Sequence, residues 1–247
     1  MKEYKLLDVK LQTLPKHIVR DSLHSFLNSD SQHQVVTVNP EFIVATRKNQ
    51  EFLNIINEAS LATIDGAGII KALQFLGHPV SLEDRLTGVK LTEIITDIAV
   101  NNNHKILFCL YSKGLTKSDK FFMHLKESYP ALDFQVADEN TALDKARFFS
   151  PQIILVGFGA PYQDLWIAEN LSKIPSAKVA VGVGGTFDYM SGKIKRAPKI
   201  FRSFGFEWLW RLISQPLRIK RINRAIIVFP FLIIKDRYKK YKEYSTR

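Results

Sequence analysis

Short apolar runs with the length of strands alternate with segments of helical periodicity along almost the whole chain. Runs such as 35–38, 61–64 and 153–157 are too short and too rich in β-branched residues to favour helices. Between them, apolar residues recur at the three- and four-residue spacing of a helix, as in 15–28. Because parallel strands need long crossover connections, usually helical, the alternation predicts an α/β fold with a Rossmann-like, mostly parallel sheet flanked by helices.

The same patterns place the individual elements. The first twelve residues alternate polar and apolar side chains and predict one opening strand, and Pro40 begins a helix expected to continue through Ile56. The remaining expected strands are 105–110, 132–137 and 178–183, and the remaining expected helices are 67–76, 89–100, 116–128, 141–149 and 163–171.

Charge divides the chain into two unequal parts. The 35 Lys and Arg residues exceed the 24 Asp and Glu residues, and the net charge is +11. Residues 193–247 carry 16 of the basic and three of the acidic side chains, so the rest is close to neutral. We therefore expect an α/β core over 1–195 and a basic, amphipathic helical appendage over 196–247. A tail of this charge predicts a polyanion or an anionic membrane surface as partner.

No segment resembles a membrane-spanning helix or a secretory signal. The longest apolar run, 225–234, contains Pro230 and has about half the length that a spanning helix needs. The amino-terminal residues lack the apolar stretch of a signal peptide. The sequence thus predicts a cytosolic protein that touches a membrane at most. Cys109 lies within an apolar run and is expected to be a buried strand thiol.

Polar residues and glycines gather where the predicted strands end. In a parallel α/β sheet, ligands bind at the carboxyl ends of the strands. The candidates are Thr37, Asn39, Asp65, Gly66, Gly157, Gly159, Gln163, Gly184, Gly185, Thr186 and Asp188. Taken singly, Asn39 before Pro40 fits a helix cap equally well, and Asp65-Gly66 fits a turn. Convergence on one edge of one sheet favours a binding site.

Several other chemistries find no support in the sequence. It has no G-x-G-x-x-G motif near the amino terminus, no Walker-type G-K-[ST] and no G-x-S-x-G elbow, and its six histidines lack ligand spacing. No D-x-D pair is present to hold a divalent metal. We therefore expect no metal and no cofactor, and cationic side chains would have to neutralise an anionic leaving group.

Six ordered blocks carry a resemblance that covers almost the whole chain. They are T-V-N-P-E-F-I-V at 37–44, D-G-A-G-I-I at 65–70, R-L-T-G-V-K-L at 85–91, V-G-F-G-A-P-Y-Q-D at 156–164, V-G-G-T-F-D-Y-M-S-G-K-I-K-R-A-P at 183–198 and G-F-E-W-L-W-R-L at 205–212. In these blocks the chain resembles the WecG/TagA/CpsF glycosyltransferases.

This resemblance implies an inverting and metal-independent enzyme, peripherally bound at the cytoplasmic face of the cell membrane, that extends undecaprenyl-diphosphate-linked sugars. The TagA type transfers N-acetylmannosamine from UDP-ManNAc to GlcNAc-diphospho-undecaprenol for wall teichoic acid. Two departures leave the donor sugar open: Gln163-Asp164 replaces a common Gln-Glu, and 71–74 lacks a common aromatic-Ala-Arg run. Another UDP-sugar (ManNAcA, glucose or glucuronate) used in capsule or exopolysaccharide synthesis is the alternative.

The resemblance and the strand-end positions suggest the same roles. Asp65 is the expected general base, Thr37 and Asn39 would hold the sugar or the acceptor, and Arg85 would stabilise charge on the departing UDP. The residues assigned to substrate binding are Gly66, Gly157, Gly159, Gln163, Gly184, Gly185, Thr186, Asp188, Arg211, Arg218 and Arg221. For the three tail arginines, attraction to an anionic membrane is the alternative explanation.

Two other functional classes remain open. A nucleic-acid-binding module would account for the basic tail, but the sequence contains no recognised nucleic-acid motif and we expect no nucleic-acid partner. A non-catalytic protein that binds a nucleotide sugar or a lipid would keep the glycine turns without needing Asp65. Assembly with a second copy of the chain is also left open.

Overall fold

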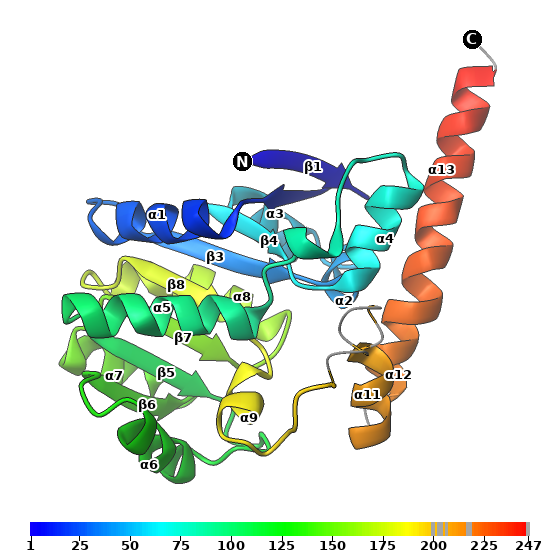
Figure 1. The fold of residues 1–247 in the computed structure, drawn as a ribbon. Helices are drawn as coiled ribbons and strands as arrows, with labels where there is room; N and C mark the ends of the chain where they lie inside the picture. The colour runs from blue at the N-terminus through cyan, green and yellow to red at the C-terminus, as the bar shows by residue number, and fades with distance from the viewer. Residues whose placement is uncertain (199–200, 202–204, 206, 216–218, 246–247) are drawn as a thin grey trace.

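A single eight-stranded sheet forms the centre of the molecule, in a computed structural model that describes residues 1–198, 201, 205, 207–215 and 219–245 (Figure 1). The strand order is β1-β2-β4-β3-β8-β7-β5-β6, and apart from the antiparallel β1–β2 pair the paired strands are parallel. The strands are β1 (Lys2–Leu6), β2 (Val9–Thr13), β3 (His33–Val38), β4 (Leu61–Ile64), β5 (Ile106–Leu110), β6 (Phe134–Asp138), β7 (Ile153–Gly157) and β8 (Val179–Gly182). The predicted α/β class is confirmed.

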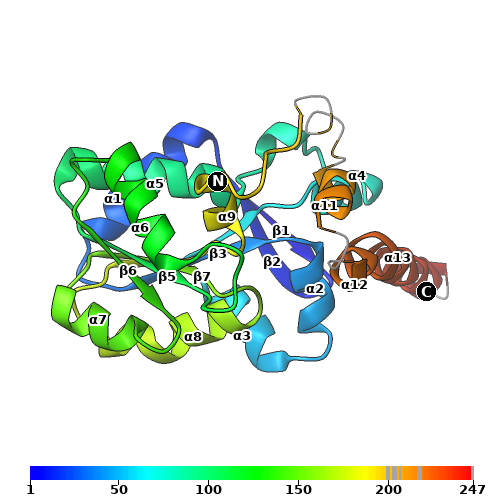
Figure 2. The same ribbon diagram turned by 90° about the horizontal axis from the view of Figure 1, so that it is seen from below.

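Helices cover both faces of the sheet (Figure 2). One face carries α1, α5, α6 and α9, and the other carries α2, α3, α7 and α8. The helices of this part are α1 (Lys16–Leu27), α2 (Pro40–Thr46), α3 (Gln50–Glu58), α4 (Ala67–Phe75), α5 (Gly88–Asn102), α6 (Ser118–Ser128), α7 (Ala142–Phe149), α8 (Tyr162–Asn170) and α9 (Thr186–Met190). The central strands are therefore buried on both sides, which explains their continuous apolar runs.

Two local predictions were wrong. The opening segment is a hairpin instead of one strand, because Leu7 and Asp8 adopt positive φ angles of 50° and 71° and turn the chain back on itself. The helix expected from Pro40 through Ile56 is divided into α2 and α3. Asn49 starts the second helix, since its side chain accepts a hydrogen bond from the N–H of Phe52 at 2.9 Å.

The C-terminal segment lies along one end of the core (Figures 1 and 2). It contains α11 (Glu207–Ser214), α12 (Ile219–Asn223), the π-helical stretch η4 (Arg224–Val228) and α13 (Phe229–Ser245). Pro230 stands in the first turn of α13, directly after η4. Proline has no N–H to donate and would crowd the carbonyl four residues earlier. The wider π-helical turn before Pro230 accommodates both the missing N–H and the bulk of the ring.

Few of the described side chains of the C-terminal segment enter the core. Ile222, Phe229 and Ile233 are buried, and the last two join the cluster formed by α2, α4 and the strands near them. The boundary expected after residue 195 stays a prediction. Among the described residues, no helix combines the length and the apolar character needed to cross a membrane.

Cys109 lies in the middle of β5 and is completely buried, as predicted. Burial is the main reason that the pKa of its thiol is raised, and the negative charge of Asp138 raises that pKa further. The thiolate form is therefore disfavoured. The residue is part of the apolar packing against α7 and α8.

Candidate active site

Two cavities meet at the carboxyl ends of β3 and β4. One has a volume of about 270 Å³ and is mostly polar, and it reaches from Thr37 to Gly184 and Arg196. The other has a volume of about 430 Å³ and a mostly apolar lining between α4 and the C-terminal segment. Three residues line both cavities: Asn39, Asp65 and Arg85. The sheet edge predicted to carry the site thus contains two cavities, and Asp65 lies at their junction.

Asp65 is the first residue after β4. Its N–H donates to the carbonyl of Val38 at 2.8 Å, which extends the β3–β4 ladder by one bond, and its carbonyl accepts from Nε of Arg85 at 2.9 Å. Gly66 follows at the start of α4, where a Cβ would collide with the ring of Pro40. The close approach of Pro40 to Gly66 leaves no room for a side chain after Asp65, and the Arg85 bond holds the Asp65 carbonyl.

Thr37 and Asn39 reach the site from the end of β3. The Thr37 hydroxyl donates to the carbonyl of Gly182 at 2.9 Å, which ties β3 to the last residue of β8. The Oδ1 atom of Asn39 accepts hydrogen bonds from the N–H groups of Glu41 at 2.9 Å and Phe42 at 3.3 Å. Asn39 is therefore the helix cap that the sequence allowed, and it also lines both cavities.

Gln163 joins two glycine turns. Its Oε1 atom accepts from the N–H of Gly159 at 3.2 Å and from the N–H of Gly184 at 2.9 Å. Both glycines have left-handed backbones, with φ angles of 85° and 55°. Gly184, Gly185, Thr186 and Gln163 line the polar cavity. Gln163 is almost completely buried, so its amide holds the shape of this wall.

Asp164 lies directly behind this wall and is completely buried. A Cβ on Gly182 would collide with its carboxylate, so the glycine is needed for β8 to pass over it. Neither carboxylate oxygen makes a hydrogen bond of good geometry with the described residues. Burial, only partly offset by the adjacent Gln163 amide, raises the pKa of Asp164 to about 7.

Among the described residues, three arginines supply positive charge to the polar cavity. Arg85 and Arg221 were predicted, and Arg196 was not assigned to the site although its block K-I-K-R-A-P carried part of the resemblance. Nε of Arg221 lies 2.7 Å from a carboxylate oxygen of Glu41, and Nη1 of Arg196 lies 3.6 Å from Glu93. Both ion pairs are partly exposed. The guanidinium groups are thus held at the rim of the cavity.

Three expected binding residues do not line either cavity: Gly157, Gly159 and Asp188. The Asp188 carboxylate accepts a hydrogen bond from the hydroxyl of Thr116 at 2.8 Å and so fixes the α9 turn. Gly157 lies where a Cβ would collide with the Phe187 ring. Arg218 and the side chain of Arg211 lie outside the described residues.

The arrangement combines a carboxylate, a polar pocket with backbone amides and three guanidinium groups. Arginine forks match the oxygens of phosphate esters, and glycine turns let amides approach them closely. The described residues contain no group of three or more His, Cys, Asp or Glu side chains placed to hold a metal ion. The fold and this site fit an α/β enzyme that acts on a phosphate-bearing substrate.

Comparison with known proteins agrees with this class and narrows it. Residues 4–243 match the model of the glycosyl transferase WecG/TagA/CpsF family, so the chain belongs to that family and is a glycosyltransferase. Proteins from three *Staphylococcus aureus* strains, MRSA252, MW2 and NCTC 8325, are each 30% identical to it over 227 residues, or 89% of this chain and 87% of theirs. Each is named N-acetylglucosaminyldiphosphoundecaprenol N-acetyl-beta-D-mannosaminyltransferase. The resemblance stated from the sequence blocks is confirmed.

Proposed function

We propose that the protein transfers N-acetylmannosamine from UDP-ManNAc to GlcNAc-diphospho-undecaprenol, with inversion at the transferred sugar and without a metal ion. The names of the *Staphylococcus aureus* relatives support this activity. The observation that carries it here is the junction of a polar and an apolar cavity at Asp65. A hydrophilic donor and a lipid-linked acceptor need these two environments on either side of one reacting group.

The chemistry follows from the position of Asp65. A hydroxyl of the acceptor GlcNAc attacks C1 of the donor sugar, while Asp65 takes the hydroxyl proton as general base. The bond between C1 and the UDP oxygen breaks, and its electron pair leaves with the diphosphate. One displacement of this kind inverts the configuration at C1. The Arg85 bond to the Asp65 carbonyl keeps the base and a cation side by side.

Arginine side chains take the role of a metal in this proposal. Arg85, Arg196 and Arg221 line the polar cavity and would neutralise the charge that develops on UDP. The N–H of Gly185, which lines the polar cavity next to Gly184, would contact the donor phosphates. Activity is therefore expected to persist in excess EDTA. Loss of activity in EDTA that added Mg²⁺ or Mn²⁺ restores would contradict metal independence.

Membrane docking by the C-terminal segment would bring the acceptor to the site. This segment exposes large apolar side chains on α12 and α13, among them Ile219, Phe231, Ile234 and Tyr238. Its many basic residues would each contribute about 1 kcal/mol near an anionic surface. We infer a peripheral position on the cytoplasmic face of the membrane, where the lipid-linked sugar would be presented.

The donor sugar can be identified by direct assay. Purified protein is incubated with a GlcNAc-diphospho-lipid acceptor and a panel of UDP-sugars: ManNAc, ManNAcA, glucose and glucuronate. We expect UDP-ManNAc to give the highest kcat/KM, with an inverted anomeric product observed by NMR. The unusual 71–74 block contributes Lys71 and Ala72 to the apolar cavity, and no residue of that block lines the polar one. Preference for another UDP-sugar would assign the protein to capsule or exopolysaccharide synthesis instead.

A further inference from the structure

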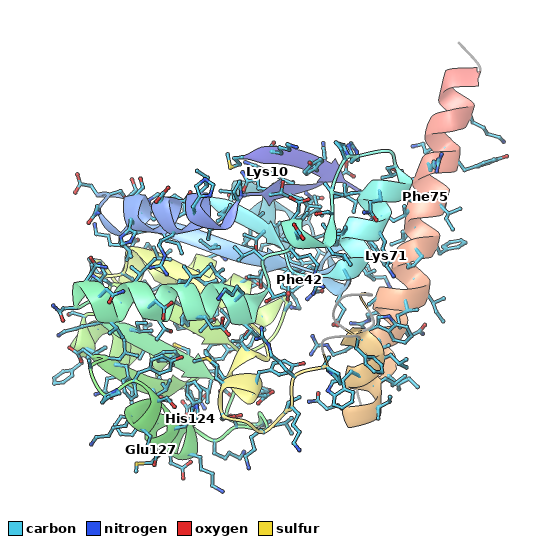
Figure 3. The ribbon with its side chains drawn as sticks, viewed as in Figure 1. Lys10, Phe42, Lys71, Phe75, His124 and Glu127 are labelled. Carbon is cyan, nitrogen blue, oxygen red and sulfur yellow. The ribbon has the colours of Figure 1, made fainter. Side chains whose placement is uncertain are left out.

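The apolar cavity is a groove with two distinct walls. Helix α4 forms one wall, and α12, η4 and α13 form the other; Figure 3 shows Lys71 and Phe75 on the part of α4 that neighbours α13. At the far end Arg237 joins the walls, because its Nη1 atom donates to the Phe75 carbonyl at 2.9 Å and its guanidinium lies 4.3 Å from the centre of the Phe75 ring. Small side chains, Ala72 on one wall and Ala225 on the other, leave the space between them open.

Polarity changes along the groove. At one end it is shared with the polar cavity through Asn39, Asp65 and Arg85, and Lys71 adds a second cation to its lining. Toward the far end, where Arg237 meets Phe75, the lining is apolar, with Ile233 and Ile234 of α13 among its residues. Glu41 also lines the groove, but its carboxylate is paired with Arg221. The groove therefore suits an elongated amphiphile with an anionic head near Arg85 and a hydrocarbon tail along α13.

We propose that this groove binds the first isoprene units of the acceptor's polyprenyl chain, with the diphosphate at the mouth beside Arg85 and Lys71. The inference rests on the proposed function, since that function supplies a diphosphate lipid as acceptor. Continuity with the polar cavity supports this occupant: the sugar attached to the diphosphate then lies at Asp65 without the lipid having to cross polar surface. The protein thus recognises the lipid directly, in addition to any contact with the bilayer.

Direct binding without a membrane tests the groove. Farnesyl diphosphate and inorganic diphosphate are titrated into the full-length protein, with no vesicles and no detergent micelles, and their affinities are measured by calorimetry. Burial of the farnesyl chain predicts an affinity at least ~10-fold higher than that of inorganic diphosphate. Equal affinities would overturn the proposal, as would tight farnesyl binding that appears only after anionic vesicles are added.

A pair of tryptophan substitutions locates the binding. Ala225→Trp fills the groove and is expected to reduce farnesyl diphosphate affinity to that of inorganic diphosphate. Ile227→Trp, two residues away and 65% exposed outside the groove, is the matched control and is expected to keep wild-type affinity. Unchanged circular dichroism and UDP affinity show that each variant is folded. Equal losses in both variants, or no loss in Ala225→Trp, would remove the groove as the lipid site.

Transfer assays separate this inference from the proposed function. GlcNAc-diphospho-lipids with farnesyl and with short alkyl chains are compared as acceptors for the wild type. A higher kcat/KM for the farnesyl acceptor, lost in Ala225→Trp and kept in Ile227→Trp, supports the groove. A protein that transfers sugar equally well to both acceptors has the proposed activity without the lipid site. A protein that binds farnesyl diphosphate in the groove but transfers no sugar has the lipid site without the proposed activity.

Discussion

The α/β core and the C-terminal segment build their parts of the site in different ways. In the core, Thr37 and Gln163 are almost completely buried and bonded to neighbouring strand ends, so the polar cavity is shaped by the sheet itself. In the C-terminal segment, burial depends on a few residues such as Phe229, while Phe231 is 63% exposed. One half of the site is therefore built into the fold, and the other half depends on a shallow contact between two parts of the chain.

This difference suits the two parts to the different tasks that we propose for them. A site that must close around a diphosphate gains from preorganised amides and cations, which the sheet edge provides. A site that must admit a long lipid gains from a wall with few buried contacts, because such regions open at low free-energy cost. Arg221 connects the two tasks, since it lines the polar cavity from the C-terminal segment and is paired with Glu41 on α2.

Removal of the C-terminal segment gives the largest expected effect. A chain ending at Lys195 would lose one wall of the groove, Arg196 and Arg221. We expect a folded core with no detectable transfer to a lipid-linked acceptor and no binding to anionic vesicles, measured by product formation and vesicle sedimentation. A truncated core with full activity on that acceptor would reduce the segment to an anchor.

Within the core, the strongest point effect is expected at Asp65. Asp65→Ala removes the proposed base and is expected to lower kcat by about 10²–10⁴-fold. UDP affinity should stay close to that of the wild type, because the described wall around Gln163 and Gly184 is unchanged. Steady-state kinetics and UDP titration measure both quantities. Turnover close to that of the wild type would eliminate Asp65 as the base.

Substitution of two phenylalanines in one apolar cluster would compare the stability of the core with that of the C-terminal segment. Phe52 belongs to α3 and Phe229 to α13, and both are almost completely buried. Truncating a buried Phe to Ala costs about 3–5 kcal/mol of unfolding free energy. We expect that full cost for Phe52→Ala in denaturant unfolding of the core.

For Phe229→Ala we expect a much smaller change in core unfolding, together with faster proteolysis within the C-terminal segment. This result would follow if the segment detaches before the core unfolds, as the predicted boundary after residue 195 requires. Equal losses for both variants would show instead that the two parts unfold as one unit.

The sequence predicted most of this architecture because its signals are local. Period and length of the apolar runs placed most helices and strands of the core close to their observed positions, and strand-end polarity placed Thr37, Asp65 and Gln163 on one sheet edge. The errors also have local causes. Two non-glycine residues in left-handed conformation made the hairpin at Leu7-Asp8, and the cap at Asn49 was overlooked within a longer apolar pattern.

The parts that were not predicted depend on tertiary packing. Asp188 was predicted to bind substrate because it is an aspartate that follows a strand end. In the structure its carboxylate instead accepts a hydrogen bond from Thr116, 72 residues earlier in the chain. Arg196 was seen only as one of many tail cations, because no pattern in the sequence shows which of them turns back to the cavity. The apolar groove has no local signal at all, since its two walls come from α4 and from residues more than a hundred positions later.

The last comparison sets a buried carboxyl group in the core against a partly exposed ion pair at the segment. Burial raises the pKa of Asp164 to about 7, above the value of an unfolded aspartate near 4. Between these values the folded state holds a proton that the unfolded state has released. The contribution of Asp164 to the unfolding free energy is therefore expected to fall with rising pH, by up to about 1.4 kcal/mol per unit, and to level off above pH ~7.

Asp164→Asn removes this titration while nearly keeping the side-chain volume. The variant is expected to match the wild type near pH 4 and to be more stable at pH 8, as measured by urea unfolding across the pH range. The matched control is Glu41→Gln, which breaks the partly exposed pair with Arg221 and should change stability by only about 0–1 kcal/mol. If the stability difference between Asp164→Asn and the wild type stayed constant from pH 4 to pH 8, Asp164 would be ionised in the folded core. The wall behind Gly182 would then hold a negative charge next to the site proposed for an anionic donor.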